Sequence, residues 1–220
     1  MVQIAIVDHH LLVAKGIARI IEAANPNYKV VNISKNAHEF LSCLKHRKAE
    51  KIDLVIINYD MIGLNGIDLC YLLKRDFPEI KKIGLGILGK HEKVIGFLYY
   101  GCKAFVTKTC NEADLIAAIE ISIKNEFCFN QYVMPKMVKQ IEHKKIEFNF
   151  PLGLSDNNYF FIKLSNTNIT YKSMAEILNI SENTLHKIQQ RVFDKFKVTN
   201  RTDLVKIAFE NDLLANYLVF

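Results

Sequence analysis

Side chains able to bind protons or cations stand directly after short apolar runs in the N-terminal half of this sequence. The first group is Asp8-His9-His10, the second is Asn58-Tyr59-Asp60, and the last is Thr107-Lys108. In an open parallel sheet, the residues that follow the strands meet at one edge, where such folds carry their sites. We therefore expect the Lys108 ammonium to lie near Asp8 and to neutralise that carboxylate.

The histidine pair raises the separate question of a metal site. Adjacent residues at a strand end point in opposite directions, so His9 and His10 are not expected to converge on one ion. We interpret both as loop histidines and Asp60 as an exposed loop carboxylate. The sequence predicts neither a metal nor a cofactor.

Five short apolar runs are typical of the strands that would position these residues. The run Leu54-Val55-Ile56-Ile57 is apolar throughout, which suits a central strand of a parallel sheet covered on both faces. The other expected strands cover residues 4–7, 28–33, 83–88 and 104–106. Gly84 and Gly86 weaken the fourth of these, because glycine adds no side-chain packing.

Amphipathic stretches separate the apolar runs. In the first stretch, apolar residues recur at helical spacing, namely Val13, Ile17, Ile20, Ile21 and Ala24. Four further stretches follow the same pattern, and Asn111 is suited to cap the last of them. Five strand–helix units in residues 1–125 predict an α/β fold with a doubly wound, five-stranded parallel sheet.

The rest of the chain differs in character. Residues 126–150 are expected to form a partly helical linker, with Lys136 to His143 as its helix, and residues 151–220 an all-α domain. Thr170 and Ser181 are placed to cap two consecutive helices. The first would bury Met174, Ala175, Ile177 and Leu178, and the second would bury Leu185, Ile188, Val192 and Phe196. Two short helices joined by a tight turn form a helix-turn-helix pattern.

The motifs of residues 1–125 together resemble the receiver domain of bacterial response regulators. The segment from Asn58 to Gly66 is similar to that family's aspartate segment, with Met and Gly three and eight residues after the acceptor position. The segment from Gly101 to Lys108 is similar to its Gly-to-Lys segment. The resemblance implies a CheY-like, flavodoxin-like fold, with Lys108 as the family's lysine and Phe105 at its aromatic switch position.

Three working positions depart from the receiver pattern. The acceptor aspartate is replaced by Asn58, the second acid after the first strand by His9, and the Ser or Thr after the fourth strand by Gly86. An amide is not a competent nucleophile, glycine offers no hydroxyl, and Asp8 alone is a poor Mg²⁺ site. The degenerate phosphoacceptor site thus comprises Asp8, His9, Asn58, Gly86, Phe105 and Lys108, and we expect it not to be phosphorylated.

Residues 154–205 resemble the LuxR-type DNA-binding domain of the NarL/FixJ regulators. The run from Ala175 to Leu185 is similar to its first helix, turn and second helix, and the run from Asn200 to Val205 to its Arg-Thr-Glu-Ala-Val segment. This resemblance implies a recognition helix that enters the major groove of DNA, and a last helix, from Thr202 to Leu213, that is often used for dimerisation. Candidate base-reading residues are His186, Lys187, Gln190 and Arg191, and candidate phosphate contacts are Thr170, Lys172 and Thr184.

The net charge of +6 permits an acidic partner, but it is not concentrated in the helical part. Residues 151–220 carry eight basic and seven acidic residues, which argues mildly against simple electrostatic capture of DNA by that part. The five scattered cysteines have no zinc-like spacing and are interpreted as small buried hydrophobes. No signal-peptide pattern and no apolar run of membrane-spanning length is present, so we expect a cytoplasmic protein.

Two hypotheses remain open. The first is a transcriptional regulator that binds double-stranded DNA as a homodimer without phosphorylation, its receiver serving as a platform for dimerisation or for a protein partner. The alternative is a protein-interaction adaptor that has lost both phosphorylation and DNA binding, which the balanced charge of the helical part favours. Enzyme activity is the least expected class, because no catalytic triad or phosphate-cradling glycine loop occurs.

Overall fold

The computed structural model describes residues 1–46, 51–87, 91–143 and 150–214. Contacts divide the chain into two compact units. The first contains an α/β sheet and the second contains the C-terminal helices. None of the helices in the described ranges is long and apolar enough to cross a membrane.

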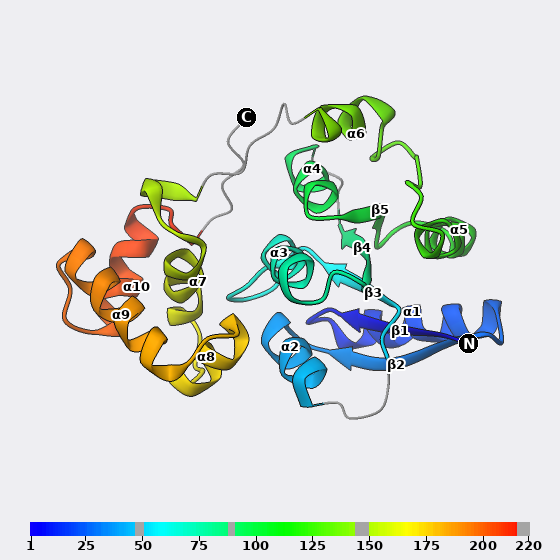
Figure 1. Cartoon of the computed structure of the whole chain (residues 1–220). Coiled ribbons are helices and arrows are strands. Elements are labelled where there is room, and N and C mark those ends of the chain that lie inside the picture. Colours follow the sequence, from blue (N-terminus) through cyan, green and yellow to red (C-terminus); the bar gives the residue numbers. More distant parts are fainter. Residues whose placement is uncertain (47–50, 88–90, 144–149, 215–220) are drawn as a thin grey trace. The chain divides into compact units, whose positions relative to one another are not determined.

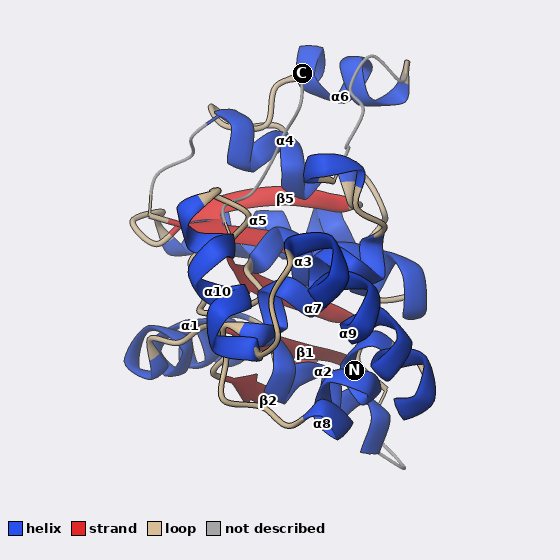
Figure 2. Ribbon diagram, turned by 90° about the vertical axis from the view of Figure 1, so that its left-hand side faces the viewer, coloured by secondary structure: helices blue, strands red, loops and turns tan. Residues whose placement is uncertain are grey.

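The first unit is built on five parallel strands in the order β2-β1-β3-β4-β5, drawn in red in Figure 2. This order confirms the predicted doubly wound sheet. β3 is buried along its whole length, as expected of the central strand. The strands are β1 (Val2–Val7), β2 (Tyr28–Ser34), β3 (Leu54–Asn58), β4 (Lys81–Gly86) and β5 (Cys102–Thr107).

Helices cover both faces of this sheet. Figure 1 shows α1 and α5 on one face and α2, α3 and α4 on the other. The first of these faces holds a continuous apolar core in which Ile6, Ile56 and Leu85 of the strands meet Ile21 and Ile119 of the helices. The helices are α1 (Leu11–Ala24), α2 (Ala37–His46), α3 (Gly66–Asp76), α4 (His91–Tyr99) and α5 (Glu112–Ile123).

Two expected details of this unit were wrong. The buried face of α1 is formed by Ala14, Ile17, Ala18 and Ile21, whereas Ala24 is exposed at the helix end. Val13 and Ile20 of the expected stripe pack against the same core and are partly buried, and the stripe missed Ala14 and Ala18. The fourth strand begins at Lys81 and ends at Gly86. Ile87 is exposed, and the expected last position, residue 88, lies outside the described residues.

Close packing accounts for two glycines, one within β4 and one at the start of α3. A Cβ atom on Gly84 would lie 2.8 Å from ring atoms of both Phe97 and Phe105. One on Gly66 would lie 2.5 Å from the Asn58 carbonyl oxygen. Glycine is therefore required here for close approach, so Gly84 does not weaken β4 as the sequence suggested.

The predicted linker helix is present as α6 (Pro135–Glu142), which packs against α4 of the first unit. Pro135 occupies its first turn, where the missing N–H would have no partner within the helix. Met137 and Val138 are its buried residues. Residues 144–149 of the expected linker lie outside the described residues.

The second unit is helical, as the sequence predicted. It consists of the short 3₁₀ helix η1 (Pro151–Gly153) and of α7 (Asp156–Ser165), α8 (Tyr171–Leu178), α9 (Glu182–Phe196) and α10 (Arg201–Glu210). The predicted caps Thr170 and Ser181 each accept a hydrogen bond from a backbone N–H of the first turn. All predicted core residues of α8 and α9 are buried except Phe196, which is half-buried because α9 ends there.

The cysteines are all free thiols. Cys70, Cys102 and Cys128 are buried as expected, whereas Cys43 and Cys110 are partly exposed. The sulfur atoms of Cys70 and Cys102 lie 3.5 Å apart. Burial raises the pKa of the Cys70 thiol well above its ordinary value, which disfavours the reactive thiolate.

Candidate functional site

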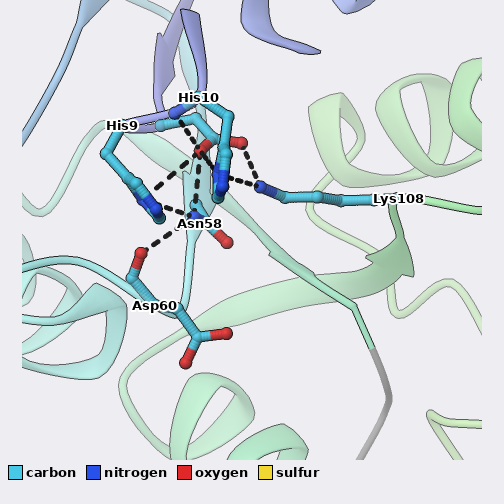
Figure 3. A network of polar contacts seen from close by, with 6 residues as sticks. His9, His10, Asn58, Asp60 and Lys108 are labelled. Carbon is cyan, nitrogen blue, oxygen red and sulfur yellow. Dashed lines mark hydrogen bonds and ion pairs between the residues drawn. The ribbon is translucent and has the colours of Figure 1, made fainter.

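Residues at the carboxyl ends of β1, β3 and β5 meet at one edge of the sheet, shown in Figure 3. Strand register explains the meeting, because Val7 pairs with Ile57 and Gly86 with Thr107. Asp8, which follows β1, and Asn58, the last residue of β3, are therefore neighbours. Asp8 is completely buried, and Asn58 is 1% exposed.

Lys108 forms a close ion pair with Asp8. Its Nζ atom lies 2.7 Å from Asp8 Oδ2 and 3.1 Å from Nδ1 of His10. The Lys108 side chain is 12% exposed, so this charge pair is largely shielded from water. A paired ammonium compensates the cost of burying the Asp8 carboxylate.

The amide nitrogen of Asn58 lies at the centre of this edge. Nδ2 donates to Asp8 Oδ1 and to the backbone oxygen of Asp60, both at 3.0 Å, and lies 3.4 Å from Nδ1 of His9. The amide oxygen Oδ1 is buried without a hydrogen-bond partner among the described residues. The side chain thus acts as a donor toward Asp8, where an acceptor aspartate would act through its oxygens.

The two histidines converge, contrary to the expectation that they diverge. Their ring centroids are 3.7 Å apart, and both Nδ1 atoms face Asp8 Oδ1, at 3.7 Å for His9 and 3.2 Å for His10. β1 ends at Val7, and the chain bends at His9, so strand alternation does not apply to these residues. The backbone N–H of His10 also donates to Asp8 Oδ1 at 2.9 Å.

The remaining predicted positions lie around this centre. Gly86 ends β4, and its carbonyl oxygen accepts the backbone N–H of Lys108 at 2.8 Å. Phe105 is fully buried and packs against Phe97 and Tyr132, with ring centroids 5.7 and 6.0 Å away. The switch position therefore holds an inward-facing ring in this structure.

The Asp60 carboxylate points away from the centre in Figure 3. It is exposed, as expected, and pairs with Lys93 at 3.4 Å. The same ammonium lies 3.5 Å from the centroid of the Tyr59 ring. What the sequence could not indicate is the part played by the backbone oxygen of Asp60, because every residue has one.

A magnesium ion does not fit the groups at this edge. Mg²⁺ requires oxygen ligands in near-octahedral arrangement. Asp8 is the one carboxylate that faces the centre among the described residues. Its two oxygens are already engaged by Asn58, His10 and Lys108. The Asp60 carbonyl oxygen is likewise engaged, by the Asn58 amide nitrogen.

The second unit presents its candidate residues on an open surface. Leu185, Ile188 and Val192 are buried on one side of α9. All seven predicted DNA-contact residues are exposed, namely Thr170, Lys172, Thr184, His186, Lys187, Gln190 and Arg191. Within the described residues, no hydrogen bond or ion pair holds the side chains of Lys187, Gln190 and Arg191.

Three of the seven have contacts of their own. Thr170 and Thr184 pair their hydroxyls with those of Ser173 and Ser181, at 3.0 and 2.9 Å. His186 Nδ1 lies 3.4 Å from Gln189, whose amide in turn donates to the Tyr171 hydroxyl at 3.2 Å. The hydrogen bond of Gln189 to Tyr171 joins α9 to the start of α8.

Sequence reasoning missed the structural role of Arg201. Its guanidinium donates to the carbonyl oxygens of Ser165 and Ile169 at 2.9 and 2.8 Å, and to those of Leu164 and Thr167. These carbonyls end α7 and form the loop before α8. The motif at Asn200 to Val205 contained the residue, but its partners lie more than 30 positions away.

A doubly wound five-stranded domain with this edge, followed by a helix-turn-helix, defines the class of two-domain regulators. Comparison with known proteins agrees. Residues 4–120 match the family model of the response regulator receiver domain, and residues 165–208 match that of bacterial regulatory proteins of the luxR family. The chain belongs to the response regulators, with a receiver domain and a LuxR-type DNA-binding helix-turn-helix domain.

Relatives cover nearly the whole chain. The response regulator GacA of Pseudomonas viridiflava is 23% identical over 218 residues, covering 97% of this chain and 98% of its own. UvrY of Escherichia coli is 22% identical, covering 97% and 96%. A solved RcsB–DNA complex is similar in fold, with a TM-score of 0.54, 21% identity, and coverage of 93% of this chain and 96% of its own.

Proposed function

We propose that this protein is a cytoplasmic transcriptional regulator that binds double-stranded DNA as a homodimer and whose receiver is not phosphorylated. The observation that supports the last point most strongly is the Asn58 amide, which donates to Asp8 and Asp60 at the centre of the receiver edge. An amide offers no carboxylate nucleophile and is a poor ligand for a hard cation, which supports this proposal. Control of DNA binding then rests on abundance or on another ligand of the receiver.

The exposed face of α9 supports DNA binding. Lys187, Gln190 and Arg191 stand opposite the residues that anchor the helix in its unit. Arg and Lys can read guanine, and Gln can read adenine with two hydrogen bonds. The RcsB–DNA complex supports the same use of this fold.

An exposed aromatic residue on α10 supports the homodimer. Phe209 of α10 is 75% exposed, although large aromatic residues usually avoid water. In a dimer, two recognition helices can read half-sites roughly 34–36 Å apart. The DNA site itself would then have two-fold symmetry.

Genome-wide recovery of DNA from cells that make the protein tests the DNA-binding proposal. We expect enrichment at discrete sites, and binding to those sites that is about 10³-fold or more tighter than to unrelated DNA. Binding should also weaken as salt is raised. Absence of enriched sites, together with a co-purifying protein partner, would replace this proposal with the adaptor hypothesis.

Incubation with acetyl phosphate and Mg²⁺ tests the phosphorylation proposal. We expect the intact mass of the protein to remain unchanged. The Asn58→Asp variant should also gain little phosphate, because His9 still replaces the second acid and Gly86 still lacks a hydroxyl. Combining Asn58→Asp with His9→Asp should increase labelling, since it restores oxygen ligands for the cation.

The single and double variants separate the loss of the acceptor from the other departures of the receiver site. A phosphoryl adduct on residue 58 of the unaltered protein would contradict the proposal outright. Efficient labelling of the single Asn58→Asp variant would show that the acceptor alone was missing, and that the other departures have no effect.

A further inference from the structure

His9 and His10 are joined to Asp8 in a compact set of metal-binding atoms. One atom from each of the three side chains lies within 4.8 Å of the other two. Tetrahedral Zn²⁺ has bonds of about 2.0–2.1 Å to nitrogen and oxygen, which place its ligands about 3.3–3.5 Å apart. The separations of 3.2 and 3.7 Å between Asp8 Oδ1 and the two imidazoles are close to this spacing.

A fourth donor is present at the same centre. Asn58 is buried, and its oxygen Oδ1 has no hydrogen-bond partner among the described residues. A half-turn of the carboxamide would exchange Oδ1 with Nδ2, which now faces His9. The turn would give up the hydrogen bonds of Nδ2 to Asp8 and to the Asp60 carbonyl oxygen, and the metal–oxygen bond would replace them. Figure 3 shows both imidazole rings turned toward this amide.

The geometry points to a binding site for a borderline divalent ion of the Zn²⁺ class, formed by Asp8, His9 and His10, with Asn58 Oδ1 as the fourth ligand. Two imidazoles and one carboxylate favour Zn²⁺, Co²⁺ or Ni²⁺ over Mg²⁺, which prefers oxygen ligands. The replacement of the second acid by His9, which weakens a Mg²⁺ site at this edge, therefore supplies one nitrogen ligand of a different site, and His10 supplies the other. This site does not depend on whether the protein binds DNA.

The Lys108 ammonium would compete with the metal ion for the imidazole of His10. Its Nζ contacts His10 Nδ1 at 3.1 Å and would lose this partner when the imidazole binds a metal. It can keep its ion pair with Asp8, because it contacts Oδ2 whereas the imidazoles face Oδ1. Metal binding would thus change the contacts of the residue that follows β5.

The test is titration of the untagged full-length protein with Zn²⁺, measured by calorimetry, and with Co²⁺, measured by ligand-field absorption. We expect one ion per chain. His9→Gln and His10→Gln should each weaken binding by about tenfold or more, because each removes a ligand. Both side chains are substantially exposed, so these variants are expected to fold. His46→Gln is the matched control, since His46 is an exposed histidine on α2, and it should bind as the unaltered protein does.

Two further measurements sharpen the test. Lys108→Met should bind Zn²⁺ severalfold more tightly, because the competing ammonium is gone. Millimolar Mg²⁺ should not displace Co²⁺. Equal affinities for the unaltered protein, His9→Gln and His10→Gln would overturn the proposal, and so would displacement of Co²⁺ by Mg²⁺ at comparable concentration.

Discussion

Replacement of Arg201 by alanine is expected to destabilise the helical unit by about 3 kcal/mol or more, since hydrogen bonds to charged groups contribute about 1.5–3 kcal/mol each. The guanidinium holds four carbonyl oxygens at the end of α7 and in the following loop. Carbonyls at a helix end have no partners within the helix, and they attract positive charge. Without Arg201, the carbonyls of Ser165, Thr167 and Ile169 would lose this donor in a half-buried environment, whereas that of Leu164 keeps the Thr167 backbone N–H and hydroxyl.

Lysine is not an adequate substitute at this position. Its ammonium is a compact charge, whereas the planar guanidinium presents five donors in a fixed fork. The carbonyls of Ser165 and Ile169 are contacted by different nitrogens of Arg201, Nε and Nη1. The Arg201→Lys variant should therefore recover part of the lost stability, and less than half of it.

Hydrogen exchange of the full-length chain, followed by mass spectrometry, measures this effect locally. Amides of α7, α8 and α9 should exchange faster in Arg201→Ala, while those of the sheet stay protected. Lys206→Ala is the matched control, because it removes the same charge from an exposed position of the same helix. Equal exchange in the two variants would show that the carbonyl contacts of Arg201 contribute little.

The fold could be predicted from the sequence because its signals are local. Unbroken apolar runs such as 54–57 specify buried strands, and the caps Thr170 and Ser181 specify helix starts. The wrong predictions concern positions at which the required residue depends on side chains from other elements. Ala14 and Ala18 share the buried face of α1 with Ile17 and Ile21, and Gly84 is required by two rings that come from α4 and β5.

The sequence could predict which residues form the candidate site, but not how their side chains are oriented. Parallel strands bring the residues after them to one edge, which is why Asp8, Asn58 and Lys108 were expected together. The orientation of His9 and His10 depends on a bend after β1, and the contacts of Asn58 depend on a backbone oxygen. Neither the bend nor the backbone contact is indicated by the types of residue in the sequence. The charges of α9 were visible in the sequence, but their exposure required the packing of the other face.

Alanine substitution of Arg191 is expected to weaken binding to the enriched DNA sites by about 1–3 kcal/mol, the discrimination of one base contact. The side chain is exposed beside Lys187 and Gln190. None of the three is held by a partner in the part of the chain that the structure describes. Among the described residues, these three side chains therefore have no hydrogen bond or ion pair to break when they contact a base edge. Binding to unrelated DNA should change much less, so the ratio of specific to non-specific affinity should fall.

Lys172→Ala separates positioning from base reading. Thr170 and Thr184 are unsuitable for this purpose, because their hydroxyls cap helices and their loss would also destabilise the unit. Lys172 is exposed and is not a cap. A phosphate contact at Lys172 predicts a uniform loss across all DNA sequences, and a salt dependence reduced by about one counterion.

Arg191→Ala and Lys172→Ala are compared with Lys195→Ala by mobility shift at several salt concentrations. Lys195 belongs to the same helix, but its ammonium contacts the Leu152 carbonyl at 2.8 Å near the far end, so it should not touch bases. If Arg191→Ala lost affinity for all sequences equally, α9 would contribute only charge. A loss confined to the enriched sites would instead mean that the polar face of α9 reads sequence, because charge alone cannot distinguish one duplex from another.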